Sequence, residues 1–344
     1  MKISYLPYEL KLKHEFNISY FSRKTTPVIL IRIEYEGQCG YGEASLPQYL
    51  NETQESIVLF LKSIMPIFKS YNYIDELLSI INDFKFNNLP AKAALNIALN
   101  DLKGKLNNLP VYKIFNIDDS ILPYTSFTIG LNNLNLLPDK IKEAEKYKIL
   151  KVKIGNGNDK RIITTIRGLT DKPLYVDVNQ GWNDKFYALD ILEWMNEQNV
   201  LIAEQPFPKE NYNDTQWLKD KSPIPIIADE AFQTFADLDK IKDVYTGINI
   251  KLMKCGGINN ALAIIRKAKD YNLNIMLGCM TETSCAVSAA ISIAGLIDYA
   301  DLDGNLLITN DPFTSDTIES GRLKLSSLPG LGINLFERLN FIEL

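Results

Sequence analysis

Short apolar runs, most of them ending in a charged residue, recur along the middle of the chain at intervals of roughly 25 residues. They span residues 150–154, 174–177, 200–204, 224–229, 248–251, 274–277 and 299–303, and an earlier run spans 124–128. Runs this short indicate strands rather than helices, and apolar residues on both faces are typical of parallel strands buried on both sides.

The segments between the runs have the spacing of helices. Apolar residues recur at three- and four-residue steps in 188–195 and again in 261–268. Alternating strands and helices are typical of a barrel or of an open α/β sheet. Eight units favour an α/β fold of the (β/α)8 barrel type, over residues 121–305, with its active site where the carboxyl ends of the strands meet.

A different pattern flanks the barrel. Residues 1–43 alternate like antiparallel strands with a turn at Glu36–Gly37, and a loop is expected at 17–26. Helical patterns follow at 52–68, 73–84 and 90–106. We therefore expect residues 1–120 to form an α+β capping domain, and the tail at 306–344, with its short strand and turn patterns, to return to that domain and complete it.

The composition indicates a globular protein. The chain of 344 residues is 46% hydrophobic, has a net charge of −5 and contains no basic block, so nucleic acid is not an expected partner. The N-terminus lacks a signal-peptide pattern and no apolar run reaches the ~20 residues of a membrane span, so we expect a cytoplasmic protein without membrane contact. Cys39, Cys255, Cys279 and Cys285 lack zinc-site spacing and are expected to be free. The oligomeric state stays open, a homo-oligomer included.

The chain has one histidine, His14, in a polar segment where a surface position is expected. A Ser-His-Asp triad, a Cys-His pair, an HExxH zinc site and a histidine-rich iron site would all depend on that single residue. Proton chemistry is therefore expected to use Lys, Asp or Glu.

Asp177, Glu204 and Asp229 end three successive strand patterns, so in a barrel they lie side by side. Three carboxylates without a neighbouring histidine or thiolate suit Mg2+, or Mn2+, better than zinc. The alternative is a cluster of carboxylates that flanking lysines neutralise. The mutual repulsion of three carboxylates favours the metal.

Three lysines lie at strand ends as well. Lys151 and Lys153 are two residues apart on one strand and so share a face, which in a barrel is the interior. Lys251 ends the strand four units later, which is the opposite side of an eight-stranded ring. Like-charge repulsion and burial are expected to lower the pKa of such lysines, so that each can act as a base.

Several motifs together resemble one known family. They lie at 151–153, 177–182, 204–206, 228–230, 249–257 and 278–283, with Gly42-Glu43-Ala44 and residues 90–94 nearer the N-terminus. This set is similar to the muconate-lactonising subgroup of the enolase superfamily, over essentially the whole chain. Enzymes of this superfamily use a Lys or His base with Mg2+ that stabilises an enediolate, so the resemblance implies that chemistry here.

Within the subgroup, Asp301-Leu302-Asp303 resembles the Asp-x-Asp signature of dipeptide epimerases of the L-Ala-D/L-Glu type. The resemblance implies that Asp301 and Asp303 bind a substrate ammonium and that Thr128 contacts a substrate carboxylate. It implies that Lys153 and Lys251 remove and return the α-proton of the C-terminal residue of a dipeptide, while Lys151 adds positive charge to its carboxylate. A helix N-cap or a solvated loop is the alternative for the two aspartates.

Arg23 marks a departure from that signature. Relatives specific for Ala-Glu dipeptides carry an arginine in the capping loop for the side-chain carboxylate, but here Phe21 occupies the ungapped position. Whether Arg23 or Lys24 contacts substrate, and whether the second residue is acidic or hydrophobic, stays open. The other functions considered are an N-acylamino-acid racemase, a cycloisomerase or o-succinylbenzoate synthase, a Schiff-base aldolase, and a non-catalytic binding protein.

Overall fold

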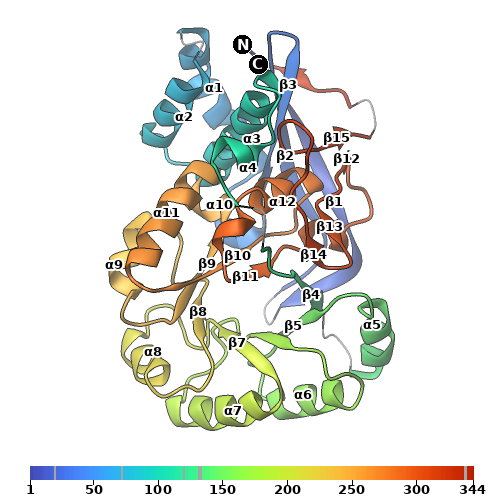
Figure 1. The fold of residues 1–344 in the computed structure, drawn as a ribbon, viewed down its shortest axis with the longest axis vertical. Helices are drawn as coiled ribbons and strands as arrows, with labels where there is room; N and C mark the ends of the chain where they lie inside the picture. The colour runs from blue at the N-terminus through green and yellow to red at the C-terminus, as the bar shows by residue number, and fades with distance from the viewer. Residues whose placement is uncertain (19–20, 71–72, 119–120, 131–133, 337–338) are drawn as a thin grey trace.

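The structure is a computed structural model that describes residues 1–18, 21–70, 73–118, 121–130, 134–336 and 339–344. Its larger part is a ring of eight parallel strands (Figure 1). These are β4 (Ser126–Ile129), β5 (Ile149–Lys153), β6 (Leu174–Asp177), β7 (Val200–Glu204), β8 (Ile226–Ala228), β9 (Gly247–Lys251), β10 (Asn274–Gly278) and β11 (Tyr299–Asp301). They pair in chain order, and a parallel bridge between Thr125 and Ala300 joins the first strand region to the last. The predicted (β/α)8 barrel is confirmed.

Helices cover the outside of the ring. They are α5 (Leu137–Glu143), α6 (Asp159–Arg167), α7 (Lys185–Glu197), α8 (Tyr212–Lys219), α9 (Leu238–Ile241), α10 (Leu252–Cys255), α11 (Ile258–Asp270) and α12 (Ser284–Ile291). The apolar positions predicted in 188–195 are the buried face of α7, whose N-terminus is capped by the side chain of Asp184. Inside the ring, a separate apolar cluster of Tyr175, Ile202, Ile227 and Met276 fills the barrel.

A cap lies over one end of the barrel (Figure 1). Its antiparallel sheet contains β1 (Lys2–Ile18), β2 (Phe21–Tyr35), β3 (Gln38–Ser45) and β16 (Ile342–Glu343), in the order β16-β1-β2-β3. Its helices are α1 (Gln54–Ser70), α2 (Ile74–Asp83), α3 (Leu89–Leu106) and the short α4 (Val111–Ile114). Helix α3 is buried on nearly all sides because it packs against both the cap sheet and the barrel helix α10.

The prediction of a loop at 17–26 is wrong for the residues of this segment that the structure describes. Asn17 pairs with Ser22 and Lys11 pairs with Thr25, so this stretch is the end of a long β1–β2 hairpin. The β-branched Thr25 and Thr26 are well suited to a strand, and a register shift between Lys11 and Phe16 adapts the pairing. Residues 19–20 lie outside the described part.

The C-terminal tail contains the short strands β12 (Phe313–Thr314), β13 (Ile318–Glu319), β14 (Arg322–Leu323) and β15 (Asn334–Leu335) before β16 pairs with β1. Ser4 and Tyr5 face Glu343 and Ile342 in that pairing. The limits at 120 and 305 stay predictions. None of the helices in the described ranges is both long and apolar enough to cross a membrane, and all four cysteines are free thiols.

Glu43 of β3 joins the cap to the barrel. Its fully buried carboxyl accepts hydrogen bonds from the backbone N–H and the hydroxyl of Thr283, the N-cap residue of α12. Burial, and then the nearby Glu282, raise the pKa of Glu43 to about 8, although the bonds from Thr283 oppose this.

The Glu43→Gln variant is expected to lose less stability than the wild type as pH rises. Glutamate in the unfolded chain loses its proton near pH 4.5, whereas folded Glu43 keeps it to about pH 8, so the folded state binds more protons across that window. The wild type therefore loses stability from pH 5 to pH 8, by on the order of 4 kcal/mol relative to Gln, which mimics the protonated acid. Urea unfolding of both proteins at pH 5, 6.5 and 8.5 measures this difference, and a constant difference would show that Glu43 is ionised throughout.

Candidate active site

A cavity of about 700 Å³ lies at the carboxyl ends of the barrel strands, beneath the cap. Its barrel wall includes Thr128, Lys151, Lys153, Asp177, Asp229, Lys251, Asp301 and Asp303, and its cap wall includes Arg23, Gln48, Tyr49 and Leu50. Nine of the ten predicted site residues therefore line one cavity. The tenth, Glu204, is almost fully buried below it, where Lys151 and Asn249 contact its two oxygens.

Lys151 and Lys153 leave the same face of β5, as predicted, and both reach carboxylates. The Nζ of Lys151 lies 2.6 Å from Glu204, 2.7 Å from Asp301 and 3.3 Å from Asp177. The Nζ of Lys153 donates to Asp177 Oδ2 and to Asn179 Oδ1, both at 2.9 Å. The Lys151 amine thus contacts carboxylates at the ends of three strands. The Lys153 side chain, on the same wall, is more exposed.

Asp229 organises the opposite wall. Its two oxygens accept from Lys251 and Lys254, each at 2.8 Å. Lys254 is buried and also donates to the carbonyl oxygens of Asp229 and Phe232. Burial lowers the pKa of Lys254, whereas Lys251 projects from the strand end into the cavity.

The lowering of the lysine pKa was predicted for lysines that face each other across a divalent cation, and for that arrangement it stays a prediction. Burial alone would lower the pKa of each amine, but the carboxylates beside them outweigh it and raise both well above the usual value. Asp301 contributes most for Lys151, and Asp229 for Lys251. The prediction treated the lysines as neighbours of a divalent cation, whereas here they are paired with its predicted ligands.

The three predicted metal ligands differ in the direction in which their pKa is shifted. Burial raises the pKa of all three, but Lys153 and Lys151 overcome it at Asp177 and bring that pKa to about 2. Lys251 and Lys254 lower the pKa of Asp229 further still. At Glu204 the effect of burial outweighs that of Lys151, and the pKa rises to about 6.

The donor set fits a hard cation such as Mg2+. Asp177 and Glu204 are register partners on adjacent strands, and the Cys279 thiol in the cavity has a pKa raised by burial, which makes it a poor ligand. Glu230, beside Asp229, has a buried Oε2 without a hydrogen-bond partner among the described residues. Within the same described part no three His, Cys, Asp or Glu side chains are grouped to hold a metal as they stand, since Lys151 lies between carboxylates.

Asp301 and Asp303 lie in the cavity wall and are 6% and 4% exposed. Asp301 accepts from Ser126 Oγ at 2.6 Å and from Lys151, and Asp303 accepts from the backbone N–H of Thr128 at 2.7 Å. Asp303 makes no capping bond to the helix that follows it. The alternative of an N-cap or a solvated loop is therefore wrong. Burial, followed by Asp301, raises the pKa of Asp303 to about 7.

Arg23 reaches the cavity from the β1–β2 hairpin. Its Nη2 donates to Thr281 Oγ1 at 2.9 Å, and burial lowers the pKa of the guanidinium. Lys24 is exposed and is not part of the cavity wall.

Sequence comparisons cover both parts of the chain. Residues 4–115 match the family described as "Mandelate racemase / muconate lactonizing enzyme, N-terminal domain", and residues 137–339 match the family described as "Enolase C-terminal domain-like". The chain belongs to the mandelate racemase/muconate-lactonizing family of the enolase superfamily. This confirms the resemblance seen in the motifs.

Members of this family with known names are similar over nearly the full chain. An L-Ala-D/L-Glu epimerase of Bacteroides thetaiotaomicron is 47% identical over 335 residues, which are 97% of this chain and 88% of the relative. An L-Ala-D/L-amino acid epimerase of Pedosphaera parvula is 34% identical over 96% of this chain and 97% of the relative. The structure of a dipeptide epimerase from Cytophaga hutchinsonii, complexed with Mg and D-Ala-L-Val, superimposes with a TM-score of 0.88 at 25% identity, covering 100% and 99% of the two chains. The prediction of an isomerase is confirmed.

Several residues that line this cavity were missed as site residues from sequence. Asn179 and Gln180 follow β6 with φ of 47° and 64°, a left-handed conformation that turns both side chains into the cavity. Tyr49 enters from the cap and donates to Met280 Sδ at 2.6 Å. Polar residues directly after a strand-end aspartate were a signal for Asn179, but no strand pattern points to Tyr49.

Proposed function

We propose that the chain epimerises dipeptides of the L-Ala-D/L-Glu type by a 1,1-proton transfer at the α-carbon of the C-terminal residue. The observation that carries this proposal is the pair Lys153 and Lys251. They lie on β5 and β9, four places apart in a ring of eight, and both amines line one cavity. A planar carbanion held between them can lose a proton on one face and gain one on the other.

The two lysines divide the proton transfer by direction. For one epimer, the Lys153 amine takes the α-proton, the electrons pass into the carboxylate as an enediolate, and the Lys251 ammonium donates its proton to the opposite face. For the other epimer the roles reverse. Lys151, between Glu204, Asp177 and Asp301, adds fixed positive charge beside the enediolate.

Asp177, Glu204 and Asp229 would hold Mg2+, or Mn2+, at the carboxyl ends of β6, β7 and β8. A bound cation supplies positive charge that stabilises the enediolate. Structures of family members with bound Mg support this assignment, as does the all-oxygen donor set.

The ends of the substrate are proposed to bind at opposite walls. Asp303, with Asp301 in the same cavity wall, accepts the ammonium of the first residue, and the backbone N–H of Thr128 donates to Asp303. Arg23, partly buried and hydrogen-bonded to Thr281, is proposed to face an acidic second side chain. The 47% identity to an epimerase named for L-Ala-D/L-Glu supports the acidic choice over the hydrophobic one.

Incubation of a dipeptide library with the enzyme and Mg2+ in D2O tests the function. Mass spectrometry should find one deuterium at the α-carbon of the second residue, with L-Ala-L-Glu among the best substrates. Deuterium in N-acylamino acids but not in dipeptides would instead favour the racemase. Trapping of a carbonyl substrate by borohydride would favour the Schiff-base aldolase.

The Asp303→Asn variant is expected to lower kcat/KM on free dipeptides by about 30- to 1,000-fold, because a charge-assisted bond to the ammonium is lost. N-acetylation of the dipeptide should do comparable damage to the wild type, and little further damage to the variant. Mg2+ affinity, measured by calorimetry, should be the same in both proteins. Equal turnover of acetylated and free dipeptides by the wild type would contradict the assignment of Asp303 as the ammonium site.

A further inference from the structure

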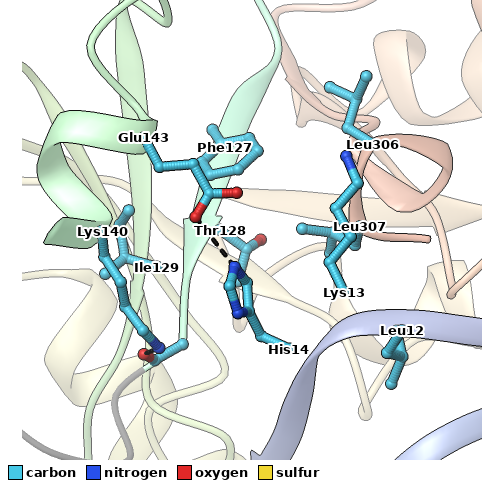
Figure 2. Close-up of a pocket in the computed structure, with 11 residues that line it drawn as sticks. Leu12, Lys13, His14, Phe127, Thr128, Ile129, Lys140, Glu143, Leu306 and Leu307 are labelled. Atoms are coloured by element: carbon cyan, nitrogen blue, oxygen red, sulfur yellow. Dashed lines mark hydrogen bonds and ion pairs between the residues drawn. The ribbon is translucent and has the colours of Figure 1, made fainter. Parts of the chain in front are cut away.

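A second, small cavity of about 40 Å³ (Figure 2) shares lining residues with the large one. Thr128 and Leu307 line both cavities. The rest of its lining combines the apolar side chains of Leu12, Phe127, Ile129 and Leu306 with the ionisable side chains of Lys13, His14, Lys140 and Glu143. His14 Nε2 and Glu143 Oε2 form a hydrogen bond at 3.0 Å. The two cavities are therefore neighbours that share a wall.

That shared wall stands beside the proposed ammonium site. Asp303 accepts a hydrogen bond from the backbone of Thr128, which is one half of the wall. A 3-10 helix, η5 (Gly304–Leu307), begins at the next residue and places Leu307, the other half, in the same cavity as Asp303. An ammonium held by Asp303 has its own α-carbon within one bond, so the side chain on that carbon starts next to the wall.

We propose that Leu307 restricts the first residue of the dipeptide to a small side chain by separating the substrate cavity from the small cavity behind it. This inference rests on the proposed function and adds to it the residue that selects the side chain of the first residue. Arg23 and Thr281 act at the second residue, whereas Leu307 acts at the first.

The chemistry of the small cavity supports this role. The apolar side chains in its lining, among them Leu12 and Phe127, could contact the end of an aliphatic side chain, but only if the isobutyl group of Leu307 were shortened. Well-packed interiors do not accept extra methylene groups without displacement of their neighbours. A methyl group on the first residue would stop short of Leu307, whereas a longer side chain directed at the shared wall would meet it.

The Leu307→Ala variant tests the proposal through its preference between two dipeptides that differ in the first residue. We compare kcat/KM for L-Leu-L-Glu with kcat/KM for L-Ala-L-Glu, by deuterium incorporation at the glutamate α-carbon. The wild type should prefer alanine, since a pocket discriminates about 10- to 200-fold per methylene group. In the variant the ratio should rise at least tenfold toward leucine.

Leu306→Ala is the matched control, because it removes the same atoms from the same 3-10 helix but lines only the small cavity. Its ratio should equal that of the wild type. An equal rise in both variants would overturn the proposal, as would a wild type that turns over both dipeptides equally well. If Leu307→Ala does not fold, Leu307→Val should shift the ratio in the same direction by a smaller factor, and no shift overturns the proposal. A wild type inactive on every dipeptide instead refutes the proposed function itself.

Discussion

Replacement of Lys153 or of Lys251 by alanine is expected to lower kcat for epimerisation by about 10³-fold or more in both directions. Each lysine serves one face of the α-carbon, and epimerisation needs both faces, so neither variant can complete the reaction. General acid and base groups typically contribute about 10²- to 10⁴-fold. The loss should appear in kcat more than in KM, because the amines act on the reacting atom.

A stereospecific exchange assay separates this two-base mechanism from mere damage to the site. Each variant should still exchange the α-proton of one stereoisomer with deuterium, and the two variants should select opposite stereoisomers. The Lys209→Ala variant is a control that removes an exposed lysine, 55% accessible, from the wall of the same cavity. Full epimerisation by either Lys153→Ala or Lys251→Ala would rule out the mechanism.

Removal of divalent cations is expected to reduce kcat/KM by about 10³-fold or more, because a cation supplies several kcal/mol to a developing enediolate. Mg2+ should restore activity better than Zn2+, which prefers nitrogen and sulfur ligands. The measurement is epimerisation after dialysis against chelator and after return of each metal. Unchanged turnover in excess chelator would contradict the metal assignment.

The same experiment has a structural readout. Asp177 pairs with Lys153, and Asp229 pairs with Lys251 and Lys254, so lysines of the chain itself can compensate these carboxylates. We therefore expect the stripped protein to remain folded, with a cooperative thermal transition. Loss of that transition on chelation would show instead that the cation holds the fold together.

The sequence predicted the barrel because a βα unit repeats, and each repeat marks where a strand ends. Asp177, Glu204, Asp229 and Lys251 could be placed around one mouth for that reason alone. The alternation of Lys151 and Lys153 similarly predicted a shared face. These are consequences of periodicity, which a single sequence displays directly.

Other features depend on contacts that periodicity does not encode. Asn179 and Gln180 adopt positive φ, which local rules reserve mostly for glycine. The raised pKa of Lys151 depends on Asp301, which is 150 residues away in the chain. Leu307 lies at the cavity because η5 turns directly after Asp303, and no apolar pattern marks that turn.

The pairing of β16 with β1 has a consequence for synthesis. Translation produces β1 first and Ile342–Glu343 only after the whole barrel has been made. Until then, a nascent chain that has folded its first three strands carries β1 with an unpaired backbone edge, which is a template for pairing with other chains. The cap sheet is thus most exposed to misassembly while the ribosome is still translating the barrel, because Ile342 and Glu343, which pair with Tyr5 and Ser4 on this edge, follow the barrel in the chain.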